Sequence, residues 1–137
     1  MTTNTACTVF NTYKIGNVTY YQRTIIPRVY WELTTQIDTT TDSANATNTT
    51  ILVIPYPANV SGKAYILASG FQRLQDKTQT WTLQKGDRIV KGVVDIDIVS
   101  SIIEIDNNPA LEVATIYQFS LKDFGSKTLQ HWEVLAK

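Results

Sequence analysis

Chemically reactive side chains are scarce in this chain of 137 residues, which has one cysteine and one histidine. With Cys7 alone, neither an internal disulfide nor a thiolate metal cluster can form within the chain. A nucleophilic triad would have to use His131, whose neighbours Trp132 and Val134 instead indicate a terminal strand beside the core. The sequence therefore predicts no enzyme activity, no metal site built on these residues and no cofactor.

Charge is also scarce, since 18% of the residues are charged where roughly a quarter is usual. Twelve basic residues balance twelve acidic ones, so the formal net charge is zero. A domain that binds duplex DNA normally carries a basic excess that displaces counterions from the phosphates. We therefore expect no sequence-specific nucleic-acid binding, whereas weak self-repulsion tolerates self-association.

Long hydrophobic runs are absent. The longest, residues 51–54 and 65–68, are far too short to cross a bilayer. Residues 1–5 (MTTNT) have neither the basic region nor the apolar stretch of a signal peptide. We expect that the protein does not contact a membrane. We also expect that it assembles in the cytoplasm of the cell that makes it.

Alternating apolar and polar residues dominate what is present, and helical periodicity is nearly missing. A turn at Gly16-Asn17 predicts an N-terminal β-hairpin, and Pro27 predicts an edge, bulge or bend. About seven or eight short strands and at most two helical turns are expected, one of the turns capped by Ser69. The fold class is therefore all-β, with residues 1–137 forming a single domain as a small barrel or sandwich. The expected strands cover residues 8–10, 18–26 resuming as 28–33 after Pro27, 51–54, 65–67, 81–83, 88–93 running on into 94–98, 111–121 and 129–135.

Four acidic residues, Asp95, Asp97, Glu104 and Asp106, flank an interruption near Ser101. A tight hairpin there would oppose like charges and would need a cation such as Ca²⁺ between them. A capping box formed by Ser101 and Glu104 would open a helical turn and separate the carboxylates without an ion. The sequence leaves both arrangements open.

Residues 34–50 (TTQIDTTTDSANATNTT) form the most unusual segment. Ile37 is its one large apolar residue, and Asp38 and Asp42 are its only charges. Such a segment cannot bury enough apolar area to offset the entropy lost on ordering. We predict an extended polar loop at 34–50 that is ordered by neighbouring subunits, since long loops of this kind tend to be functional.

Several motifs together resemble a family of small head–tail connector (neck) proteins of long-tailed bacteriophages and prophages. The segment 81–92 (WTLQKGDRIVKG) is joined in this resemblance by residues 29–32 (VYWE), the N-terminal hairpin, Tyr117 and residues 130–134 (QHWEV). The family motif residues are Trp31, Trp81, Gly86, Asp87, Gly92, Gly125, His131, Trp132 and Glu133.

The layout of a hairpin, a long polar loop and a strand ending in Pro55-Tyr56 is similar to stopper, or head-completion, proteins. The resemblance implies a small β-barrel in a homo-oligomeric ring, six- or twelve-fold, that binds portal or adaptor protein and tail proteins. It places the ring at the head–tail junction of the virion, assembled in the bacterial host cytoplasm, where DNA passes through without sequence-specific binding. The implied channel-facing residues are Thr34, Thr35, Gln36, Ile37, Asp38, Thr39, Thr40, Thr41, Asp42, Ser43, Ala44, Asn45, Ala46, Thr47 and Asn48.

Two alternatives remain at this point. A tail-completion or tail-terminator protein would also form a ring, but would bind the tail tube. A lectin-like carbohydrate-binding module is suggested by the abundant Tyr, Trp, Asn and Thr residues.

Overall fold

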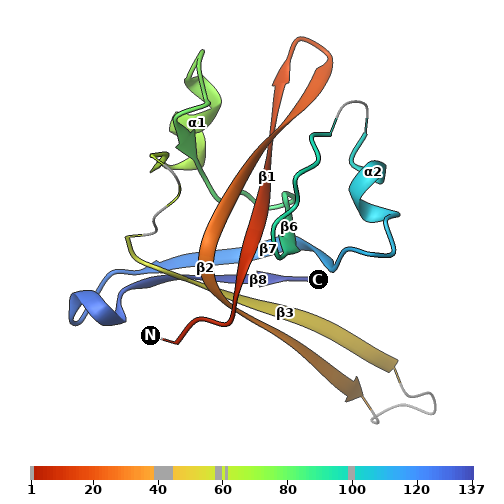
Figure 1. Ribbon diagram of the computed structural model, residues 1–137, viewed down its shortest axis with the longest axis vertical. Coiled ribbons are helices and arrows are strands. Elements are labelled where there is room, and N and C mark those ends of the chain that lie inside the picture. The colour runs from red at the N-terminus through yellow and green to blue at the C-terminus, as the bar shows by residue number, and fades with distance from the viewer. Residues whose placement is uncertain (1, 39–44, 58–59, 61, 99–100) are drawn as a thin grey trace.

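A closed antiparallel barrel forms the body of the protein (Figure 1), in the strand order β1-β2-β3-β8-β7-β6. The computed structural model describes residues 2–38, 45–57, 60, 62–98 and 101–137. The all-β prediction is confirmed, and the barrel is the correct one of its two expected forms. The elements are β1 (Thr5–Ile15), β2 (Val18–Asp38), β3 (Asn45–Pro55), β4 (Ala64–Tyr65), α1 (Ala68–Arg73), β5 (Thr80–Trp81), β6 (Arg88–Lys91), α2 (Ile103–Asp106), β7 (Val113–Lys122), the 3-10 turn η1 (Lys127–Leu129) and β8 (His131–Ala136).

The N-terminal hairpin is formed by β1 and β2 and extends beyond the barrel (Figure 1). Its turn is the predicted one, with Gly16 at φ 64°, a backbone conformation that glycine adopts without strain. Near Pro27 the register shifts, so that Thr5 pairs with Val29 whereas Cys7 pairs with Ile26. Of the edge, bulge or bend predicted at Pro27, the ladder has a bulge-like register shift. Proline favours such a shift because it has no N–H to donate to the ladder.

The second hairpin, β2 with β3, corrects the loop predicted at 34–50. Residues 34–38 continue β2 and residues 45–50 begin β3, paired from Thr34↔Thr49 to Asp38↔Asn45. The loop prediction is therefore wrong at both ends, because it weighed only apolar burial. Threonine suits extended strands, and each strand satisfies the backbone of the other. Of the predicted channel-facing residues, Thr39, Thr40, Thr41, Asp42, Ser43 and Ala44 lie outside the described residues.

The barrel interior is filled by alternate residues of its strands. On β8, Trp132, Val134 and Ala136 are buried, and the residues between them are partly exposed. Trp132 packs edge-to-face on Trp81, with ring centroids 5.4 Å apart, and Tyr65 contacts both rings. Aromatic pairs in this geometry stabilise a core beyond the area they bury. Trp81 and Ile54 belong to this core, at 1% and 0% exposed.

A second apolar cluster covers part of the outside of the barrel. Phe10 on β1 and Val90 on β6 point outward, and they are buried by Val94 and by Ile105 of α2. The segment between β6 and β7 therefore folds back over the barrel wall, close to β6 and opposite α1 (Figure 1). The interrupted alternation of the sequence reflects this excursion.

Both helical turns form, but only one has its predicted cap. At α2, the Ser101 N–H donates to the Glu104 carboxylate at 3.0 Å and the Ser101 hydroxyl accepts from the Ile103 N–H, as in a capping box. At α1 the N-cap is Leu67 without a side-chain bond, so the predicted Ser69 cap is wrong. Neither α-helix of the described residues has the length and apolarity required to cross a membrane.

Candidate functional site

The outer part of the β2–β3 hairpin, residues 33–38 and 45–49, is a polar two-stranded ribbon, here called the arm. Its described side chains are mostly exposed, including Leu33, Thr34, Thr35 and Asn48. The Thr35 hydroxyl donates to the Asn48 side-chain oxygen across the pair at 2.8 Å. Among the described strands, β1 pairs with β2 only up to Val29 and β8 pairs with β3 only from Thr50. Both edges of the arm therefore face away from the barrel's own strands.

The motif residues taken from the resemblance lie in the barrel framework. Trp31, Trp81 and Trp132 are at most 3% exposed, so none of them offers a platform on which a sugar could stack. Gly86, Gly92 and Gly125 all have positive φ and lie outside the strands. His131 and Glu133 lie on β8, with 3.9 Å between the imidazole Nε2 and the carboxylate. The motif residues therefore contribute mainly to the barrel framework and not to a binding surface.

Asp87, beside Gly86, is a buried carboxylate at 1% exposure. It accepts hydrogen bonds from Asn11 Nδ2 at 3.0 Å, Gln84 Nε2 at 2.7 Å and the Thr12 hydroxyl at 2.7 Å. Burial raises the pKa of Asp87 above its ordinary value, although these donors oppose the shift. Asn11 also bonds the backbone of Thr82, so the network joins β1 to the segment after β5. It fastens the segment between β5 and β6 to β1.

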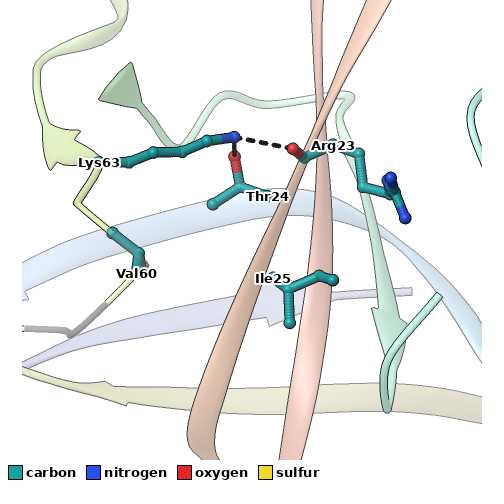
Figure 2. A pocket seen from close by; sticks show the side chains of 5 residues that line it. All are labelled: Arg23, Thr24, Ile25, Val60 and Lys63. Carbon is teal, nitrogen blue, oxygen red and sulfur yellow. Dashed lines mark hydrogen bonds between the residues drawn. The ribbon is translucent and has the colours of Figure 1, made fainter. Parts of the chain in front are cut away.

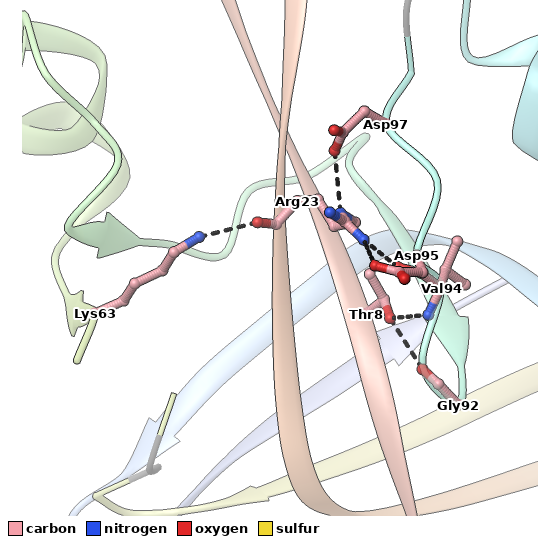
Figure 3. Close-up of polar contacts among 7 residues, drawn as sticks. All are labelled: Thr8, Arg23, Lys63, Gly92, Val94, Asp95 and Asp97. Atoms are coloured by element: carbon pink, nitrogen blue, oxygen red, sulfur yellow. Dashed lines mark hydrogen bonds and ion pairs between the residues drawn. The ribbon is translucent and has the colours of Figure 1, made fainter. Parts of the chain in front are cut away.

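Three of the four acidic residues near Ser101 form ion pairs with arginines, and Figure 3 shows those of Asp95 and Asp97. Arg23 contacts Asp95 at 2.9 Å and Asp97 at 3.1 Å, and it also donates to the Val94 carbonyl. Arg88 binds both oxygens of Asp106 at 3.0 Å. The capping-box arrangement is thus the one that forms, and the carboxylates fasten the excursion to the barrel.

Neutralising either partner of Arg23 is expected to change stability little. Asp95 and Asp97 have side chains that are 93% and 78% exposed, and exposed pairs contribute roughly 0–1 kcal/mol. We expect Asp95→Asn and Asp97→Asn each to lower the free energy of unfolding by less than about 0.5 kcal/mol in urea titrations. Arg23→Ala should cost more than either, because it also removes the bond to the Val94 carbonyl. Equal losses in all three variants would contradict this account.

Lys63, just before β4, is among the residues that line three cavities. One of them, about 190 Å³, is lined by Lys63, Val60 and residues 23–25 (Figure 2). The ammonium donates to the Arg23 carbonyl at 2.9 Å and the Thr24 hydroxyl at 3.0 Å. Burial and then the charge of Arg23 lower the pKa of Lys63. Among the described residues, no carboxylate forms an ion pair with it.

The second of these cavities, about 360 Å³, has aromatic rings in its walls and is here called the aromatic cavity. Tyr56, Tyr65, Trp132 and Leu121 line it, together with Lys63 and Ala64 at its wall. Tyr56 stands edge-on to Trp132 with centroids 4.9 Å apart and is 39% exposed. The sequence analysis missed this cavity because its walls come from distant segments that share no motif.

Cys7 and His131, the reactive side chains noted in the sequence, are both held within the fold. The described residues contain no group of three or more His, Cys, Asp or Glu side chains that could hold a metal ion. Cys7 is fully buried, and burial raises the pKa of its thiol, which disfavours the reactive thiolate. His131 Nδ1 lies 2.8 Å from the Leu129 carbonyl oxygen, so this ring nitrogen forms a hydrogen bond with the backbone.

Comparison with known proteins gives one relationship. No curated protein and no solved structure is significantly similar to this chain. A family model, DUF6751, described as a family of unknown function, matches residues 1–137. Since the match covers the whole length, the chain belongs to the DUF6751 family.

Proposed function

We propose that this protein is a structural, non-enzymatic component of a phage neck. In this proposal it forms a homo-oligomeric ring at the head–tail junction as a stopper, or head-completion, protein. The ring joins the portal or adaptor to the tail and helps to retain DNA, which passes through without sequence-specific contacts. The motif resemblance supports this assignment, and a closed barrel with hairpins extending past its wall is a suitable architecture for it (Figure 1).

The arm is the observation that carries the proposal. A two-stranded ribbon is marginally stable alone in water, and this one has no further strand on either edge among the described residues. Edges of this kind are templates for pairing or packing with another chain. A closed ring supplies such a neighbour to every subunit.

The low charge of the arm suits a channel through which DNA moves. Across residues 33–38 and 45–49 the only charged side chain is Asp38. Lysine or arginine there would bind phosphates and hold the DNA by counterion release. A threonine-rich ribbon without basic residues lets the duplex slide and leaves retention to the shape of the assembled ring.

Shortening the arm tests the proposal directly. Replacing residues 36–47 by Asn-Gly would join the paired residues Thr35 and Asn48 through a two-residue turn that suits a hairpin. We expect the free energy of unfolding to stay within about 0.5 kcal/mol, because other residues build the core. Phage particles carrying the variant should lose packaged DNA or fail to join tails, as measured by DNA content and electron microscopy.

A matched control exchanges Gly16-Asn17 for Asn-Gly at the tip of the other hairpin, which changes neither length nor the arm. Particles with this control should be normal. Full infectivity of the shortened-arm variant would contradict the channel role. Cryo-electron microscopy of intact particles would then place the chain: density next to the adaptor supports a stopper, and density capping the tail tube identifies a tail terminator.

A further inference from the structure

Two exposed apolar side chains stand at the end of the β7–β8 hairpin, here called the tip (residues 123–129). Phe124 is 73% exposed and Leu129 is 62% exposed, and the tip lies at the far end of β7 and β8 from the C-terminus (Figure 1). Asp123, next to Phe124, is exposed as well. Burying such a large aromatic ring against a partner would remove apolar surface from water and stabilise the contact.

The aromatic cavity has the complementary chemistry. Its volume of about 360 Å³ exceeds the roughly 150 Å³ in which an apolar cavity takes up benzene. Tyr56 and Tyr65 present rings to it, and aromatic rings prefer the edge-to-face contacts that an added phenyl ring would complete. Lys63 at its wall is a cation without a carboxylate partner among the described residues.

We propose that the tip of a second copy of this chain inserts Phe124 into the aromatic cavity and brings Asp123 towards Lys63. An acidic residue beside an exposed phenylalanine matches a cation beside an aromatic-walled cavity, so charge and shape agree. The buried ring is the anchor of the contact, and an Asp–Lys pair at the rim favours the correct register. The inference rests on the proposed function for its setting, because a ring requires such a subunit contact.

Tip and cavity are neighbours on one subunit, since Leu121 lines the cavity and Phe124 lies three residues further on. Phe124 is not among the residues that line the cavity of its own subunit, so a second copy is the occupant that the chain itself provides. Reciprocal exchange would give a two-fold pair, and one-way exchange would give a larger closed ring.

Sedimentation equilibrium of the purified full chain tests the contact up to concentrations of about 1 mM, where weak contacts are detected. We expect the wild type to self-associate and Phe124→Ser to weaken the association constant by roughly tenfold or more. Ile103→Ser is the matched control, because Ile103 is likewise an exposed apolar residue, at 58%, but lies on α2, away from the tip. A monomeric wild type, or equal weakening by both variants, would overturn the proposal.

Cross-linking gives an independent readout of the same contact. Ala64→Cys places a thiol at the cavity wall and Ser126→Cys places one at the tip near Phe124 without removing Asp123, while the buried Cys7 does not compete. Mixing the two variants under mild oxidation should give a disulfide-linked product that contains one copy of each, identified by mass. A mixture that stays uncross-linked rejects the contact even if particles place the chain in the neck. A cross-linked product from a chain found outside the neck would reject the proposed function and keep the contact.

Discussion

Replacing Trp81 with alanine is expected to lower the free energy of unfolding by roughly 3–5 kcal/mol, close to the full stability of many small domains. Trp81 is 1% exposed and packs against both Tyr65 and Trp132. Removing the indole leaves a cavity whose other walls are aromatic rings, which cannot collapse without leaving their edge-to-face positions. The cost therefore includes lost apolar burial and the cavity term together.

Urea titration followed by circular dichroism measures this effect, with Tyr117→Ala as the control. Tyr117 lies on β7 but is 36% exposed, and its alanine variant should lose less than half as much stability. The Trp81→Ala variant should shift the midpoint without changing the slope, which reports the surface exposed on unfolding. A loss under about 1 kcal/mol would show that Trp81 is not part of a packed core.

Much of the fold could be predicted because strands, turns and tryptophans act locally. The alternation on β8 predicts which residues face inward, and Pro27 predicts the bulge. The positions around Gly16 likewise predict the first hairpin. These signals depend on the period of two and on backbone geometry, both of which are visible in a single sequence.

The arm was missed for a physical reason. Its order in the structure comes from backbone pairing between residues 34–38 and 45–49, and pairing between segments leaves no apolar signature. A run of threonines is compatible with both loop and strand, so composition alone could not decide. Residues 34–38 thus extend β2 because they pair with residues 45–49, and neither segment shows this by its own composition.

The candidate sites were harder to predict because they depend on tertiary contacts. The aromatic cavity combines Tyr56, Tyr65 and Leu121 from three parts of the chain. Arg23 neutralises Asp95 and Asp97 from a strand more than 70 positions earlier in the sequence. Sequence reasoning placed these carboxylates near one another but had no means to find their arginine. Only closure of the barrel brings these groups together.

Loss of the Asp87 side chain is the second large effect that we expect. Asp87→Ala would leave donors of Asn11, Thr12 and Gln84 without their acceptor. Unpaired buried donors cost stability, and we expect a loss of roughly 2–4 kcal/mol in urea titrations. Asp87→Asn should lower the free energy of unfolding by less than Asp87→Ala, because one acceptor oxygen remains. It should still be destabilising, because the new NH₂ group would face donors instead of accepting from them. A loss under about 1 kcal/mol for the alanine variant would show that the network contributes little.

The pH dependence of the same position distinguishes burial from hydrogen bonding. Burial raises the pKa of folded Asp87 above 3.8, so its contribution is fully present below the unfolded pKa and is lost as pH rises through the folded pKa. The advantage of the wild type over Asp87→Asn should therefore shrink from about pH 4 upward. Asp76 provides the opposite case, because hydrogen bonds from Thr78 lower its pKa below 3.8. The stability advantage of the wild type over Asp76→Asn should therefore shrink as pH falls below 3.8. For Asp87, a stability advantage over Asp87→Asn that grew with rising pH would contradict this account, because it would mean that the hydrogen-bond donors outweigh burial.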